Sequence, residues 1–152
     1  MTTAQQIHTS RFGQIEFESE DVVTFPEGLV GLPNLKEFVL VQHRDDSPFR
    51  WLQSADDPTA AFLVVDPVIY VKDYSPEMPE TASSALGLDA ETPILVYTIC
   101  TIPNGTPRAM TLNLAGPVVI NSETRQARQI VIEDENYPVK FEVFSTEKGK
   151  AA

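Results

Sequence analysis

Short runs of apolar, β-branched and aromatic residues recur along the chain, and prolines and polar turns separate them. Each of the 12 prolines stops a helix or blocks a central position in a strand ladder. This pattern predicts many short strands in an antiparallel sandwich or barrel. The expected strands cover residues 14–17, 22–25, 38–43, 49–53, 61–65, 69–71, 94–102, 109–114, 118–120, 127–132 and 139–144.

Residues 75–88 depart from this pattern. They combine a proline-marked start, an alanine-rich middle and Gly87, a residue type that often ends helices. We therefore expect a short helix over 77–86, and a shorter helical turn near 32–37.

The length of 152 residues and the mass of 16.8 kDa fit one domain with a substantial core. With 42% hydrophobic and 22% charged residues, the composition excludes a disordered chain and a membrane-spanning one. The predicted fold class is mainly β: a small antiparallel β-barrel-like single domain with one or two short helices. This domain covers residues 1–152, with loose ends at about 1–9 and 145–152.

The chain shows no targeting pattern. Its first ten residues have neither the basic nor the apolar region of a signal peptide, and no apolar run approaches the roughly 20 residues of a membrane helix. Its single cysteine, Cys100, excludes an internal disulfide. We expect a cytoplasmic protein.

Acidic residues outnumber basic ones by 22 to 11, which gives a net charge of −11. Such a surface repels phosphate backbones and anionic lipid headgroups. Direct binding of nucleic acid or of a membrane is therefore not expected. A basic protein partner is favoured instead, because opposite fields accelerate encounter and set register.

Few residues suit catalysis. The chain has two histidines, His8 and His43, and it contains no P-loop, no dinucleotide-binding glycine motif and no C-x-x-C pair. Cys100 lies in a run that is apolar on both faces, which favours a buried structural cysteine over a catalytic thiol. Paired acids serve a cation or a glycosidase only where carboxylates converge, and in polar loops they are usually solvated. We expect no catalytic residue, no metal and no cofactor.

Several segments together resemble one family, the flagellar assembly factor FliW. Residues 25–32, FPEGLVGL, resemble its F-x-x-G-[LI]-x-G-[FL] motif, and residues 48–54, PFRWLQS, resemble its P-F-x-W-L-Q-S block. Residues 111–114 and 117–121 resemble parts of its C-terminal half, and the likeness covers roughly residues 9–144 in order.

These motifs also have a physical interpretation of their own. Gly28 and Gly31, flanked by prolines, predict a tight irregular turn between two strands. Asn113 and Asn121 offer side-chain hydrogen bonds to neighbouring backbone. The motif residues therefore indicate a scaffold and not a catalytic centre.

The resemblance implies a small β-barrel-like, non-enzymatic regulator with two protein partners. FliW-like proteins bind newly made flagellin and, when flagellin is scarce, bind the translational regulator CsrA and relieve its repression of flagellin mRNA. A flagellin-only secretion chaperone, an acidic β-barrel ligand-binding module and an acidic mimic of nucleic acid directed at another basic protein are the alternatives. Only the resemblance favours the regulator with two partners over the flagellin-only chaperone.

The interface residues that we expect are chosen on charge, because the family motifs do not specify a site. Phe49 and Trp51 suit either the core or an interface, and their alternation favours the core. The expected partner-binding residues are acids and one apolar anchor: Asp45, Asp46, Glu133, Asp134, Glu135 and Tyr137.

Overall fold

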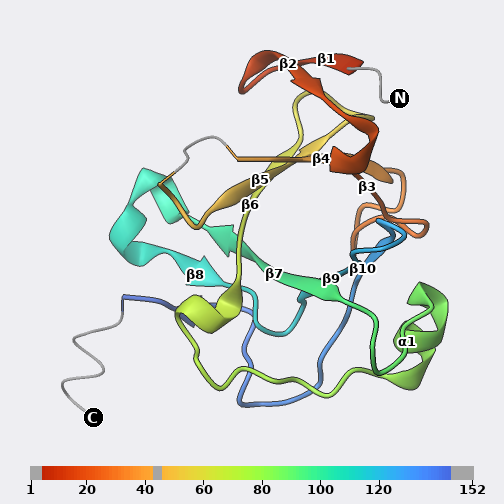
Figure 1. Cartoon of the computed structure of the whole chain (residues 1–152). Helices are drawn as coiled ribbons and strands as arrows, with labels where there is room; N and C mark the ends of the chain where they lie inside the picture. The colour runs from red at the N-terminus through yellow and green to blue at the C-terminus, as the bar shows by residue number, and fades with distance from the viewer. Residues whose placement is uncertain (1–4, 43–45, 145–152) are drawn as a thin grey trace.

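Antiparallel strand pairing organises the chain in the computed structural model, which describes residues 5–42 and 46–144. A single α-helix accompanies the strands among these residues (Figure 1). In chain order the elements are β1 (Gln5–Thr9), β2 (Gly13–Phe17), β3 (Val22–Thr24), β4 (Glu37–Val41), β5 (Arg50–Ser54), β6 (Ala61–Val65), α1 (Glu80–Leu86), β7 (Ile94–Thr101), β8 (Thr111–Leu112), β9 (Val118–Asn121), β10 (Ala127–Gln129) and β11 (Phe141–Glu142).

The larger sheet curves into a ring in the order β10-β9-β7-β6-β5-β4-β3 (Figure 1). Strand β8 pairs on one side with the C-terminal end of β7 and on the other with β11. Strands β1 and β2 form a separate two-stranded sheet. The predicted mainly β, antiparallel fold is confirmed. The sheet does not close into a full barrel: between its two end strands, β3 and β10, the pairing of the described chain is an isolated parallel bridge from Thr24 to Gln126, the residue before β10.

Buried side chains fill the ring. Every second residue of a strand points inward. The inward-pointing residues Val23, Phe38 and Leu52, from three neighbouring strands, are at most 1% exposed. The rings of Phe25 and Phe38 meet edge to face, with centroids 5.2 Å apart. A second cluster lies around β7 and β8, and a third lies beneath α1.

Four sequence predictions need correction. The helix begins at Glu80, because Pro79 at its N-cap is still extended (φ −59°, ψ 144°), although it ends at left-handed Gly87 as expected. No helix forms over 32–37: residues 33–34 form a turn, and Glu37 is already the first residue of β4. Residues 5–9 are not loose, since they pair with β2 along their whole length.

The fourth correction concerns the strand expected over 69–71. This segment belongs to a 3₁₀ helix, Pro67–Ile69, and the turn that follows it. The Asp66 side chain caps this helix by accepting a hydrogen bond from Val68 N at 3.0 Å, and Pro67 occupies its first turn. Three further expected strands, 109–114, 127–132 and 139–144, are shorter than predicted.

The turn between β3 and β4 has the tight geometry that its glycines predict. Gly28 and Gly31 both have positive φ, of 71° and 82°. A Cβ atom on Gly28 would lie 2.5 Å from the carbonyl oxygen of Leu32, so only glycine fits there.

Candidate functional site

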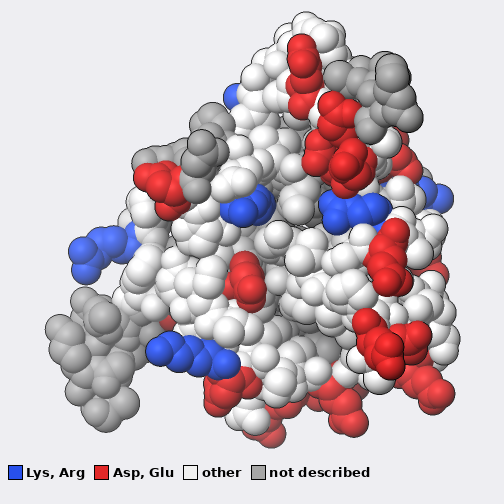
Figure 2. All heavy atoms as spheres, viewed as in Figure 1, with Lys and Arg blue, Asp and Glu red and all other residues white. Residues whose placement is uncertain are grey.

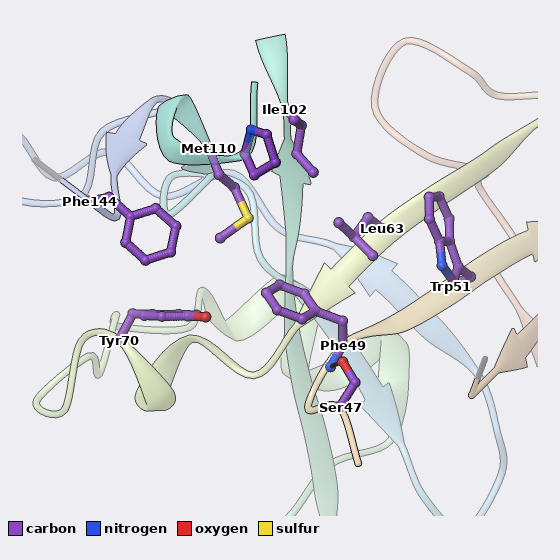
Figure 3. Close-up of a pocket in the computed structure, with 9 residues that line it drawn as sticks. Ser47, Phe49, Trp51, Leu63, Tyr70, Ile102, Met110 and Phe144 are labelled. Atoms are coloured by element: carbon purple, nitrogen blue, oxygen red, sulfur yellow. Dashed lines mark hydrogen bonds between the residues drawn. The ribbon is translucent and has the colours of Figure 1, made fainter. Parts of the chain in front are cut away.

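An apolar groove of about 320 Å³ opens on one side of the β5–β6 pair (Figure 3). We call it the aromatic groove. Strand pairing sets part of its wall, because Trp51 of β5 lies opposite Leu63 of β6. The described residues that line it come from distant parts of the chain, and none of them has a charged side chain: Ser47, Phe49, Trp51, Leu63, Tyr70, Ile102, Pro107, Met110 and Phe144.

Aromatic contacts order one end of the aromatic groove. Tyr70 lies between two rings, with centroid distances of 6.4 Å to Phe49 and 6.3 Å to Phe144. The Phe49 backbone N donates to the Ser47 hydroxyl at 3.1 Å, which fixes the entry into β5. Figure 3 shows these rings and the Met110 thioether facing the same space. Such contacts position the walls of the groove relative to one another.

The other end of the groove is braced by the turn between β1 and β2. The Arg11 guanidinium lies 4.3 Å from the centroid of a Trp51 ring, and the Phe12 ring meets Trp51 edge to face at 5.7 Å. Trp51 is therefore half-buried in a surface groove, while its neighbour Leu52 faces the interior of the ring. The interpretation of Trp51 as a core residue is wrong in this respect.

The aromatic groove presents mainly apolar side chains. Its polar groups are the hydroxyls of Ser47 and Tyr70, and burial raises the pKa of the Tyr70 phenol above its ordinary value. Phe144 is 42% exposed and Ile102 38% exposed, so the groove leaves large apolar side chains in water. Exposed apolar surface of this kind marks interaction sites.

The acidic residues predicted as partner contacts occupy separate loops. Glu133, Asp134 and Glu135 are exposed on one turn, in which the Asp134 carboxylate accepts from Asn136 N at 2.9 Å. Asp46 is exposed next to Ser47 of the groove, and Asp45 lies outside the described residues. On the face seen in Figure 2, acidic side chains gather at the top and along the lower and right margins. Their role in binding remains a prediction.

Tyr137 is half-buried and belongs to the packing between two core clusters. Its ring meets that of Tyr74 at 4.8 Å, and its hydroxyl accepts a hydrogen bond from Ser75 N at 3.3 Å. Burial raises the pKa of Tyr74, whose hydroxyl donates to the carbonyl of Leu114 at 2.7 Å. The role of Tyr137 as an interface anchor remains a prediction.

The remaining reactive groups are spread through the fold. Cys100 is buried, and this burial raises the pKa of its thiol to about 12. Within residues 5–42 and 46–144, no group of three or more His, Cys, Asp or Glu side chains is placed to hold a metal ion. None of the helices described there is long and apolar enough to cross a membrane.

The fold and the groove together define a class: a small, mainly β protein of net charge −11 with an apolar groove on its surface. The comparisons with known proteins are consistent with this class. A family model described as FliW protein matches residues 6–143. This chain belongs to the FliW family.

Individual relatives show the same likeness over most of the chain. The flagellar assembly factor FliW of Bdellovibrio bacteriovorus is 42% identical over 139 residues, which cover 91% of this chain and 79% of the relative. The corresponding protein of Leptospira biflexa is 32% identical over 140 residues, 92% of each chain. A crystal structure of the flagellar assembly factor FliW superimposes with a TM-score of 0.84 at 31% identity and covers 92% of this chain and 97% of that one.

Proposed function

We propose that this protein is a non-enzymatic flagellar assembly factor of the cytoplasm. It binds flagellin and, when flagellin is scarce, binds CsrA and relieves the repression of flagellin mRNA. Membership of the FliW family supports this proposal, since the relatives are named as flagellar assembly factors. The observation that carries it is the aromatic groove, whose described lining residues are uncharged and come from several strands and loops of the fold.

The aromatic groove is the proposed site for flagellin. A subunit that polymerises carries apolar surface that assembly buries, and this surface is exposed before assembly. A groove with exposed Phe144 and Ile102 at its margin and with Trp51 along its wall can cover such a segment. Aromatic anchors of this kind dominate binding energy at protein interfaces.

The proposed site for CsrA consists of exposed acidic residues: Asp46, Glu133, Asp134 and Glu135. A protein that binds RNA needs a cationic surface, and the net charge of −11 attracts it at long range. Asp46 and the run Glu133–Asp134–Glu135 are exposed and supply charge on two loops. In this proposal flagellin recognition is mainly apolar, while CsrA recognition is mainly electrostatic.

Calorimetric titration into CsrA, with and without bound flagellin, tests the proposed switch. Tight CsrA binding that flagellin abolishes is the expected result. Binding to both partners at once would show two independent surfaces, and binding to flagellin alone would leave a secretion chaperone. Failure to bind either partner would overturn the proposal.

Groove variants test the assignment of the flagellin site. Trp51→Ala is expected to weaken flagellin binding by about 2 kcal/mol or more, as for an aromatic anchor buried by a partner. Val131→Ala is the matched control, because Val131 is 60% exposed and does not line the groove. Since Trp51 is the single tryptophan of the chain, flagellin bound in the groove should also shift its fluorescence emission. Equal effects of the two variants would exclude the groove.

A further inference from the structure

The segment between β7 and β8 begins with a tight turn over residues 103–106, PNGT. Thr106 N donates to the carbonyl of Pro103 at 2.8 Å. The two residues between them both have positive φ, 52° at Asn104 and 68° at Gly105. A hydrogen bond across two left-handed residues is characteristic of a type I′ turn, for which Asn-Gly is a preferred pair.

Both central residues of this turn are exposed. In the part of the chain that the structure describes, neither the side-chain amide of Asn104 nor the backbone N–H of Gly105 has a hydrogen-bond partner. A Cβ atom built on Gly105 would meet nothing within 4 Å, so the space beside this residue is open. The backbone nitrogen of Gly105 and the carboxamide of Asn104 are therefore both accessible and both unoccupied by other contacts.

These two groups can react with each other, with water and hydroxide as the only other reactants. Hydroxide takes the proton of the Gly105 backbone N–H, and the nitrogen attacks Cγ of Asn104. The new C–N bond closes a five-membered succinimide ring, while the Cγ–Nδ2 bond breaks and ammonia leaves with a proton from water. Water then opens the ring at either carbonyl. Opening at Cγ gives aspartate, and opening at the backbone carbonyl gives isoaspartate, whose main chain is one methylene longer.

Among the five asparagines of the chain, Asn104 is the one that precedes a glycine. The other four precede Leu, Ser or Tyr, whose side chains shield the backbone nitrogen, whereas glycine has no Cβ atom. Asn121 is in addition buried, with hydrogen bonds at both ends of its amide. Asn34 and Asn136 are exposed and lack the following glycine, so they are controls within the same molecule.

The turn adjoins the aromatic groove. Ile102, directly before the turn, and Pro107, directly after it, both line the groove, and Met110 of the same wall follows three residues later. Figure 1 shows the segment between β7 and β8 projecting from one side of the ring, and Figure 3 shows Ile102 and Met110 facing the groove. A change of the backbone in this turn is therefore transmitted directly to two residues of the groove wall.

We propose that Asn104 is a site of spontaneous deamidation, which alters the wall of the aromatic groove as the folded protein ages. Aspartate at this position places a negative charge beside a groove whose described lining residues are uncharged. Isoaspartate also lengthens the backbone inside a turn that depends on two left-handed residues, so Ile102 and Pro107 must shift. This inference does not depend on the proposed flagellin and CsrA binding.

Mass spectrometry of the full chain, incubated folded at mildly alkaline pH and then digested in acid, tests the site. Asn104 should lose its amide at least about tenfold faster than Asn34 and Asn136, and electron-transfer fragmentation should show both aspartate and isoaspartate. Gly105→Ala should slow the reaction about tenfold or more, because the added Cβ shields the nitrogen. Thr106→Ala keeps the Asn-Gly pair and is the matched control, with a rate within about twofold of the unchanged chain.

Methyl NMR of the aged protein tests the link to the groove. After chromatographic separation, the isoaspartate form should show shifted methyl signals of Ile102 and Met110 relative to the fresh protein. Asn104→Asp isolates the effect of charge alone and should move these signals less, while Asn136→Asp, the same change outside the groove, should leave them in place. Equal rates at the three exposed asparagines, an unchanged rate in Gly105→Ala, or unmoved methyl signals in the isoaspartate form would each overturn the proposal.

Discussion

Asn121 shows at the scale of one residue how a polar side chain in the core can organise several backbone segments. It is 2% exposed, its amide donates to the carbonyl of Leu86 at 2.8 Å, and its side-chain oxygen accepts from Glu123 N and Thr124 N. The side chain thereby ties the end of α1 to the turn between β9 and β10. The sequence prediction for Asn121 is confirmed. Asn113 was also predicted to bond neighbouring backbone, but its side-chain oxygen is buried and accepts no hydrogen bond, so the prediction is wrong for that oxygen.

Replacement of Asn121 should destabilise the fold strongly. Asn121→Ala leaves the buried Leu86 carbonyl and two backbone N–H groups without their partner, at a cost of about 1–3 kcal/mol per unsatisfied group. Chemical denaturation measures the loss. Asn136→Ala is the control, because the Asn136 side chain is exposed, and a similar loss there would contradict the assigned role.

Cys100 should react very slowly while the protein is folded. Burial raises the pKa of its thiol from 9.0 to about 12, so its thiolate fraction near pH 8 is lower by about a thousandfold than in the unfolded chain. Iodoacetamide labelling followed by mass spectrometry checks this rate, with the protein in denaturant as the reference. Labelling at equal rates in both states would show an accessible thiol.

The same raised pKa gives a direction for the dependence of stability on pH. A group that holds its proton more tightly in the folded state contributes its full stability below its unfolded pKa. The contribution of Cys100 is therefore complete below about pH 9 and is lost as the pH rises toward 12.

At the scale of elements, the turn between β3 and β4 provides a matched pair of glycines. Gly31→Ala should cost about 1–2 kcal/mol, because a side chain at positive φ is strained although the space around it is open. Gly28→Ala should cost about 1–3 kcal/mol more, because its new Cβ atom meets the backbone of Leu32 and Pro33. Thermal unfolding compares the two. Equal losses would show that this turn relaxes around the added methyl group.

Strands could be predicted from the sequence where apolar residues form a clear run, and not where local polar chemistry decides. The residues of β6 and β7 are dominated by β-branched and aromatic side chains, so their positions were evident. Strand β1, with the sequence QQIHT, has no such run and depends on pairing with β2. Over residues 67–69 the cap from Asp66 outweighs the β propensity of valine and isoleucine.

The aromatic groove could not be predicted, for a different reason. Tyr70, Met110 and Phe144 are far apart in the sequence, and only the tertiary fold brings them beside β5. Each is an ordinary apolar residue in its own segment. The resemblance to FliW identified the family, but its motifs mark the turn at Gly28 and the strand of Trp51 and not the groove as a whole.

At the scale of the whole molecule, the two proposed partners should respond differently to salt. A rise in ionic strength from about 50 mM to about 500 mM shortens the screening length severalfold. CsrA binding should weaken by about tenfold or more, and flagellin binding by less than about threefold. Calorimetry at both salt concentrations measures these changes. Equal salt dependence would contradict the division between an electrostatic and an apolar site.

The break in the ring between β3 and β10 has a consequence for how the chain folds. Neighbouring strands around the rest of the ring share ladders of two or more residue pairs, and β4, β5 and β6 follow one another along the chain. Thr24 and Gln126, in contrast, lie far apart in sequence and share one bridge. Their contact closes a very long loop, and besides the bridge the seam is crossed by an ion pair between Arg128 and Glu27 at 3.3 Å and a hydrogen bond from Val30 N to the Gln129 side chain at 3.0 Å. Because the entropy of loop closure opposes such distant contacts, we expect the ring to grow outward from its central hairpins and the seam at Thr24 to form late.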